Sequence, residues 1–300
     1  MKLSFESLRD GLTVADGGWS TQLWMRGVPS GTLAELATLT HPQIVSNLAR
    51  EYVAAGAQFV TTNTFSANRI MLEKRRVAAG VAELNRAGAR LAREAVGQSD
   101  VLVVGSIGPS GKILAVREAA EEELTQVFAE QAAALAEGGA DAIVLETFSE
   151  LAEILVALKA VRSACQLPVI ASMSFDSGPQ RTRTMMGAKA EDCAAALEDA
   201  GADVVGCNCG TGIGHVLPAV VALRHATRLP LWVKPNAGLP DLEDGQAVYR
   251  QTPEEFVRHV PELIDAGANI LGGCCGTGPE HIRRLAALVA SRRRRGSPGG

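Results

Sequence analysis

The chain repeats one pattern along its length, in which a short β-branched, apolar run is followed by a longer alanine-rich stretch with helical spacing. We count eight such units. Strands are predicted at 12–15, 59–63, 101–106, 142–146, 169–173, 204–209, 231–235 and 270–274. Helices are predicted at 42–55, 80–96, 119–137, 149–164, 190–200, 213–227, 253–266 and 279–291. This alternation favours a parallel sheet with right-handed crossovers.

Four helix-to-strand junctions are nearly alike: AGAQFV at 55, GGADAIV at 138, AGADVVG at 200 and AGANILG at 266. In each, a glycine can adopt the left-handed conformation that ends a helix, namely Gly56, Gly139, Gly201 and Gly267. Eight units predict an α/β fold, a single (β/α)8 TIM barrel. The alternative, an open doubly wound sheet that binds a dinucleotide, requires Gly-x-Gly-x-x-Gly after its first strand. The sequence there is DGGWST at 16, which does not match.

One domain is expected over residues 1–291, because the 300 residues, 47% hydrophobic and 21% charged, contain no linker or composition break. Residues 292–300, four arginines followed by GSPGG, predict a disordered basic tail.

Charge and hydropathy exclude several kinds of partner. The net charge of -4 gives no field that favours nucleic acid, and no apolar run reaches the roughly 20 residues that span a bilayer. Glu6 and Asp10 stand where a signal peptide needs apolar residues. We therefore expect a cytoplasmic protein without nucleic-acid or membrane partners and with reduced cysteines. Nothing in the sequence fixes an oligomeric state.

Three cysteines lie at predicted strand ends. Cys209 ends the sixth strand in GCNCGTG at 206, and Cys274 and Cys275 end the eighth in GGCCGTG at 272. The carboxyl ends of barrel strands share one rim, so these thiols can converge on one ion. Three thiolates suit Zn²⁺ and leave a fourth position open, as in catalytic zinc sites. Cys207 shares a strand face with Cys209 and is the alternative ligand.

An open position on a sulfur-rich zinc site favours a thiol substrate, which the metal would deprotonate. The alternative is hydrolysis by zinc-bound water, which typically uses histidine and carboxylate ligands. The five histidines fall in or beside predicted helices. At the same rim, Asp16 and Glu146 suit an ammonium group, the backbone of Gly17 suits a carboxylate, and Thr62 offers a hydroxyl.

The motifs as a set resemble the homocysteine S-methyltransferase family over about residues 11–290: DGG at 16, TNTF at 62, GSIGPSGK at 105, LETF at 145, GCNCG at 206, PNAG at 235 and GGCCGT at 272. The resemblance implies a zinc barrel that transfers a methyl group to homocysteine and forms methionine. It places the metal on Cys209, Cys274 and Cys275, and homocysteine on Asp16, Gly17, Thr62 and Glu146. A different thiol or selenol acceptor stays open.

The resemblance leaves the methyl donor open among sulfonium, ammonium and corrinoid compounds. PNAGLPD and GSIGPSGK look most like the homocysteine-binding domain of cobalamin-dependent methionine synthase, but no Asp-x-His-x-x-Gly is present, so a corrinoid is expected on a separate protein. Thr147 and Leu33 stand where the betaine-using branch has aromatic residues. Aromatic residues near the mouth suit a small-molecule sulfonium donor, namely Trp19, Trp24, Phe65 and Phe148. Loops 177–189 and 237–252 are candidates for a lid or donor-docking surface.

Overall fold

The computed structural model describes residues 8, 11–243 and 246–296. Eight parallel strands form one sheet in the order β1-β10-β7-β6-β5-β4-β3-β2. Their bounds are β1 (Thr13–Val14), β2 (Phe59–Thr61), β3 (Leu102–Ile107), β4 (Ala142–Phe148), β5 (Val169–Met173), β6 (Val204–Cys209), β7 (Leu231–Pro235) and β10 (Ile270–Leu271). A parallel bridge between Ala15 and Phe59 joins the two outer strands. The sheet therefore closes on itself, and the predicted (β/α)8 barrel is confirmed.

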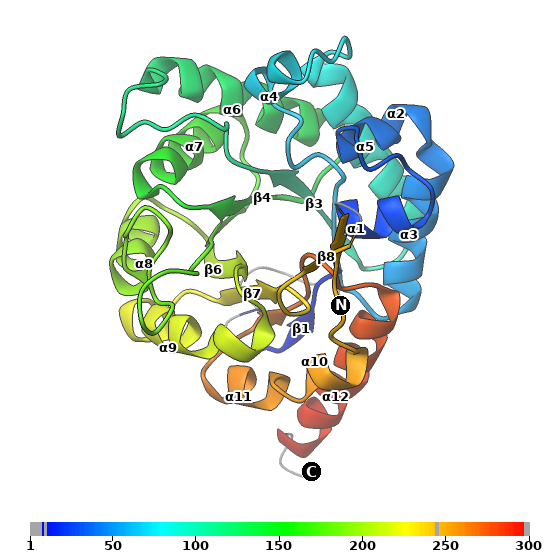
Figure 1. Ribbon diagram of the computed structural model, residues 1–300, viewed down its shortest axis with the longest axis vertical. Helices are drawn as coiled ribbons and strands as arrows, with labels where there is room; N and C mark the ends of the chain where they lie inside the picture. The colour runs from blue at the N-terminus through cyan, green and yellow to red at the C-terminus, as the bar shows by residue number, and fades with distance from the viewer. Residues whose placement is uncertain (1–7, 9–10, 244–245, 297–300) are drawn as a thin grey trace.

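Helices surround the ring of strands (Figure 1). The main ones are α3 (Pro42–Ala54), α5 (Val81–Val96), α6 (Glu121–Glu137), α7 (Leu151–Ala164), α8 (Ala190–Asp199), α9 (Leu217–Ala226), α10 (Pro253–Val257), α11 (Val260–Asp265) and α12 (Pro279–Gly296). The remaining helical segments are α1 (Ser20–Met25), η2 (Ala34–Leu36), α2 (Ala37–Thr40), α4 (Arg69–Lys74) and η3 (Ile213–His215). The helix expected over 253–266 is two helices, because Pro261 lacks the N–H that a continuous helix needs. None of the described helices is long and apolar enough to cross a membrane.

The four junction glycines adopt the predicted left-handed conformation, with φ of 101° at Gly56, 98° at Gly139, 88° at Gly201 and 95° at Gly267. A residue with a Cβ is strained at such angles. These positions therefore end the helices before β2, β4, β6 and β10 as the sequence indicates.

Helix α12 continues to Gly296, five residues beyond the helix end expected at 291. Arg292 pairs with Asp265 at 3.3 Å, and the Arg293 guanidinium donates to the carbonyl of Leu12. Basic side chains in the last turn of a helix also interact favourably with the helix dipole. The remaining part of the expected tail, 297–300, lies outside the described residues.

Strand residues alternate between two cores. One core, which includes Phe59, Val144 and Trp232, contains no residue of the helices α1 to α12 and fills the barrel interior. The other joins the outer faces of the strands to the helices. Towards the carboxyl ends, the interior positions turn polar and stay buried: Thr61, Ser106, Glu146, Ser172, Asn208 and Lys234. This polar layer forms the floor on which a site can be built.

The two long loops are locally ordered. An antiparallel hairpin of β8 (Asp241–Glu243) and β9 (Gln246–Val248) lies within 237–252, and isolated antiparallel bridges join Ser177 to Arg183 and Arg183 to Lys189. Both loops follow the carboxyl ends of strands, at the end of the barrel that carries the cysteines.

Candidate active site

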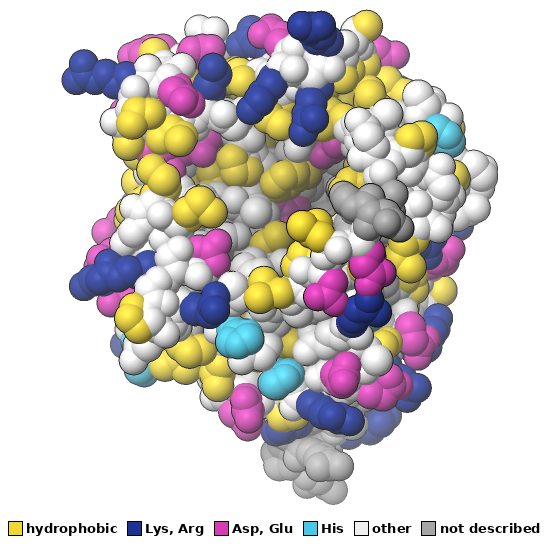
Figure 2. Space-filling model, in the orientation of Figure 1, with side chains coloured by type: hydrophobic (Ala, Val, Ile, Leu, Met, Phe, Trp, Pro, Cys, Tyr) yellow, Lys and Arg dark blue, Asp and Glu magenta, His cyan; other side chains and the backbone are white. Residues whose placement is uncertain are grey.

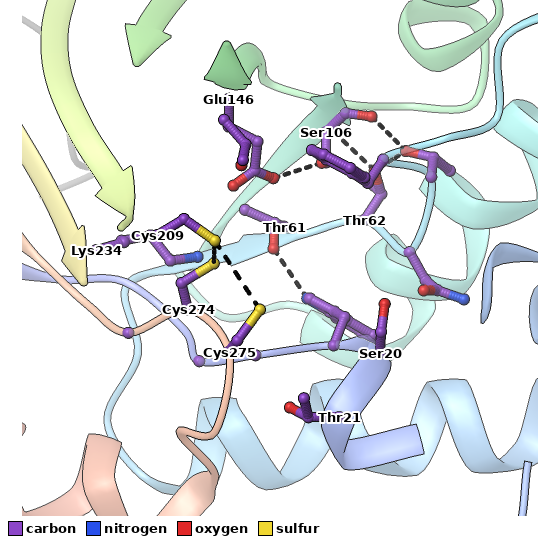
Figure 3. A pocket seen from close by; sticks show the side chains of 18 of the residues that line it. Ser20, Thr21, Thr61, Thr62, Ser106, Glu146, Cys209, Lys234, Cys274 and Cys275 are labelled. Carbon is purple, nitrogen blue, oxygen red and sulfur yellow. Dashed lines mark hydrogen bonds between the residues drawn. The ribbon is translucent and has the colours of Figure 1, made fainter. Parts of the chain in front are cut away.

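A cavity of about 200 Å³ opens at the carboxyl ends of the strands. Figure 3 shows the three cysteines on one wall and Glu146 across from them, with Lys234 beside the sulfurs in this view. These residues come from β4, β6, β7 and the turn after β10. Placement of reactive groups at this end of the barrel is the usual arrangement in TIM-barrel enzymes.

The thiols of Cys209, Cys274 and Cys275 form a cluster of metal-ligand type. All three sulfur atoms lie within 4.8 Å of one another, with Cys209 Sγ 3.3 Å from Cys274 Sγ and 3.9 Å from Cys275 Sγ. Tetrahedral zinc with Zn–S bonds of about 2.3 Å places two sulfurs about 3.8 Å apart. The cluster therefore fits zinc in both donor type and spacing.

The backbone at Cys209 decides which β6 cysteine joins the cluster. In a regular strand Cys207 and Cys209 share a face, but Cys209 has a φ of 62°, which breaks the alternation. Cys207 stays in the core between strands and helices, where burial raises the pKa of its thiol to about 12. The alternative ligand considered from the sequence is thus separated from the cluster. A non-glycine residue at positive φ is strained, and such strain often occurs at functional sites.

Asn236, directly after β7, ties the two cysteine loops together. Its Nδ2 donates to the carbonyl of Gly210 at 2.8 Å, and its Oδ1 accepts the backbone N–H of Cys275 at 3.0 Å. The N–H of Cys274 also donates to the carbonyl of Pro235 at 2.9 Å. The end of β7 therefore sets the position of Cys209 relative to the two cysteines that follow β10.

Asp16 lies beneath the cavity with no exposed surface. Its Oδ1 is 2.5 Å from Lys234 Nζ, and its Oδ2 accepts from the backbone N–H of Thr61 at 2.7 Å, the Thr61 hydroxyl at 2.8 Å and Trp19 Nε1 at 3.0 Å. Its partners line the cavity, whereas Asp16 does not. Asp16, predicted from the sequence as a site carboxylate, therefore lies behind the residues that line the cavity.

Lys234 is buried yet charged. Burial lowers the pKa of its ammonium group, but the charges of Asp16 and Glu146 outweigh this and raise the pKa above its ordinary value. The ring of Trp232 lies under the ammonium, with Nζ 5.3 Å from the ring centroid. The pair with Asp16 accordingly keeps a fixed positive charge at the cavity.

Glu146 faces the cavity from β4, and its Oε1 accepts the hydroxyl of Ser106 at 2.5 Å. Burial raises the pKa of Glu146 to about 7, although Lys234 opposes the shift. The carboxyl group is therefore poised to change charge near neutral pH.

Thr62 lines the cavity and supports Ser106. Its hydroxyl accepts the Ser106 N–H at 2.9 Å and lies 2.6 Å from the Thr64 hydroxyl, which itself donates to the Ser106 carbonyl at 2.8 Å. The Thr62 proton is thus directed at Thr64, so Thr62 acts on Glu146 through Ser106.

Gly17 and Gly18 form a tight turn at the cavity wall. A Cβ on Gly17 would lie 2.8 Å from the Tyr52 hydroxyl, and a Cβ on Gly18 would lie 2.5 Å from the Cys274 carbonyl. The Gly18 N–H donates to the Thr277 hydroxyl oxygen at 3.1 Å.

Sequence reasoning missed Lys234, Asn236, Ser106 and Glu35. The first three carried a signal: Lys234 and Ser106 occupy interior-facing positions two residues after Trp232 and Val104, and Asn236 belongs to the PNAG motif. No sequence signal pointed to Glu35. In the folded chain it lines the cavity and accepts the Ser66 N–H, and burial raises the pKa of its carboxyl group.

A family model described as homocysteine S-methyltransferase matches residues 13–289. The chain belongs to this family. The family identified from the sequence motifs is thereby confirmed.

Two curated relatives are methionine synthases. The chain is 32% identical to that of Mycobacterium leprae (strain TN) over 305 residues, and 33% identical to that of Mycobacterium tuberculosis (strain ATCC 25618 / H37Rv) over 301 residues. These matches cover 95% and 94% of this chain but only 25% of either relative. The chain thus spans about a quarter of their length.

A solved structure of a family enzyme matches nearly end to end. The metallated form of the homocysteine methyltransferase MmuM from Escherichia coli superposes with a TM-score of 0.79 at 25% identity, covering 95% of this chain and 99% of that one. That relative has therefore been solved with metal bound. The cysteine cluster described above consists of side chains that can hold a metal.

Proposed function

We propose that this protein is a zinc-dependent S-methyltransferase that methylates homocysteine to methionine. The convergence of three sulfurs within 4.8 Å, on the wall of a cavity of small-molecule size, carries the proposal. Zinc on Cys209, Cys274 and Cys275 would hold the acceptor sulfur as a nucleophilic thiolate.

The protein's own residues bind and orient the acceptor. Deprotonated Glu146, fixed by Ser106, takes the ammonium group, while Thr62 holds Ser106 in place. Gly17 has no Cβ, and its backbone can therefore pack against Tyr52 and Thr277 at the cavity wall. Asp16 acts indirectly, by holding Lys234. Positioning of this kind converts methyl transfer into a step between oriented groups.

The reaction is a displacement at the methyl carbon. The acceptor thiol releases its proton to solvent, its sulfur forms a bond to the methyl carbon, and the bond between methyl and donor breaks. The electron pair of that bond leaves with the donor.

The surface around the cavity favours a donor carried by a protein. Among the described residues, seven of the eight exposed large hydrophobic side chains lie in segments that follow barrel strands at this end: Met25, Ile113, Val116, Met185, Met186, Leu239 and Leu242. Figure 2 shows hydrophobic side chains around the central hollow. Exposed apolar side chains gathered in this way are typical of interaction sites. We infer that a separate protein, such as a methyl-corrinoid carrier, docks here.

The test is methionine formation by the zinc-loaded protein from homocysteine with methylcobalamin, S-methylmethionine, S-adenosylmethionine or betaine. Transfer from a protein-bound methyl-corrinoid at a higher rate than from every free donor supports the docked donor. Cys209→Ser is the control and is expected to give none. Absence of both methionine and thiol-linked proton release on adding homocysteine would contradict the proposal. Homoselenocysteine, tested alongside, identifies a selenol acceptor by its higher rate.

A further inference from the structure

The buried ion pair between Lys234 and Asp16 determines which charged group the cavity presents to an acceptor. Lys234 is 2% exposed and Asp16 is fully buried, and their charged atoms are 2.5 Å apart. An ammonium group of the protein thus already occupies the carboxylate that the family resemblance assigns to the substrate ammonium.

Asp16 has little capacity left for a second cation. Its two oxygens already accept from four groups: Lys234 Nζ, the Thr61 N–H, the Thr61 hydroxyl and Trp19 Nε1. A carboxylate has about four lone-pair sites. An approaching ammonium group would also meet repulsion from Lys234.

Lys234, in contrast, has capacity to spare. Its ammonium group has three N–H donors, and Asp16 is its hydrogen-bonded partner among the described residues. Among the described residues that line the cavity, Lys234 is also the sole lysine or arginine. The backbone N–H of Gly18 already donates to Thr277. The backbone of Gly17, which the sequence suggests for the carboxylate, offers a neutral donor, whereas Lys234 offers a charged donor, which makes the stronger hydrogen bond.

We propose that Lys234 binds the carboxylate of the acceptor, so that the site selects thiols bearing a carboxylate and treats the α-ammonium group as secondary. The inference rests on the proposed function and names its substrate class, the mercaptocarboxylates, of which homocysteine is one. Lys234 lines the same cavity as the three cysteines. The carbonyl of the next residue, Pro235, accepts the N–H of Cys274, which keeps the two segments adjacent. One acceptor can therefore present its sulfur to the cluster and its carboxylate to Nζ.

The experiment compares three thiols by calorimetric titration of the zinc-loaded protein without any donor. The probes are homocysteine, 4-mercaptobutyrate, which lacks the ammonium, and 3-mercaptopropylamine, which lacks the carboxylate. We expect 4-mercaptobutyrate to bind within about tenfold of homocysteine and the amine to bind at least about a hundredfold more weakly, as for loss of a buried charge pair.

Lys234→Met should remove this discrimination and, by freeing Asp16, strengthen binding of the amine. Removing one partner of a buried pair destabilises a protein strongly, so the double variant Asp16→Asn/Lys234→Met removes both charges together. We expect it to retain zinc and to bind the two analogues within about tenfold of each other. Lys159→Met, on the exposed face of α7, is the matched control and should behave as wild type.

The inference is overturned if the wild type binds 3-mercaptopropylamine more tightly than 4-mercaptobutyrate. It is equally overturned if the double variant ranks the three thiols as the wild type does. If no thiol binds the zinc-loaded wild type, the proposed function itself fails and this inference falls with it.

Discussion

Asn236 accepts the backbone N–H of Cys275 at 3.0 Å while its amide donates to the loop that follows Cys209. One side chain at the end of β7 thus fixes the separation of ligands that lie 66 residues apart in sequence. Groups that orient metal ligands commonly matter almost as much as the ligands themselves.

Asn236→Ala should weaken zinc binding by about 10- to 100-fold with little change in fold, since it removes both hydrogen bonds. Competition with a chelating dye measures the affinity. Asn47→Ala, at an exposed position on α3, serves as the control. Unchanged zinc affinity in Asn236→Ala would show that the backbone alone holds the two loops.

The positive φ at Cys209 leads to a second prediction, because it puts Cys209 and Cys207 on different sides of the barrel wall. Cys209→Ser should lose zinc and methyl transfer, whereas Cys207→Ser should keep its full zinc stoichiometry. Cys207→Ser buries a hydroxyl among apolar groups and should lose about 1–3 kcal/mol of unfolding free energy. Metal analysis together with thermal unfolding separates the two effects, and loss of zinc in Cys207→Ser would count against this assignment.

Gly18→Ala should disturb the cysteine cluster, because Gly18 packs against the backbone of Cys274. Its new Cβ would lie 2.5 Å from the Cys274 carbonyl, so the backbone that carries the ligands must shift. Overpacking of this kind costs about 1–3 kcal/mol. Zinc affinity and melting temperature should both fall. Gly31→Ala meets nothing within 4 Å and is expected to change neither; equal effects in the two variants would refute the close approach.

The raised pKa of Glu146 predicts a stability that depends on pH in the metal-free protein. Burial raises this pKa from 4.5 to about 7, so folding favours the protonated form, and this contribution is lost as pH rises through 7. The difference corresponds to about 3 kcal/mol. Glu146→Gln should therefore unfold at higher denaturant concentration than wild type at pH 8.5, and at similar concentration at pH 4.

The titration of Glu146 should also affect the binding of homocysteine. Homocysteine affinity should rise with pH through about 7 in the wild type, because the ammonium group needs an ionised Glu146. Glu94→Gln, an exposed control on α5, should leave both profiles unchanged. A Glu146→Gln protein with the wild-type pH profile of stability would contradict the prediction.

The sequence alone was sufficient to predict the fold and the convergence of the three cysteines. Four repeated glycine junctions specified left-handed helix ends, and apolar runs specified buried strands, because both depend on local backbone and hydrophobic preferences. Cys274 and Cys275 were placed at the rim by the same logic. The local pattern was less informative at the end of α12, where contacts with Asp265 and Leu12 accompany helix beyond the predicted boundary.

Only the tertiary structure decided which charged groups meet. Asp16 and Lys234 are 218 residues apart, and the closure of β1 against β10 and β7 brings them together. Likewise, the two β6 cysteines are equivalent in pattern, and a single backbone angle at Cys209 distinguishes them. Periodicity predicts the face from which a side chain leaves a regular strand. The ion pair and the backbone angle at Cys209 depend instead on segments that become neighbours only when the barrel closes.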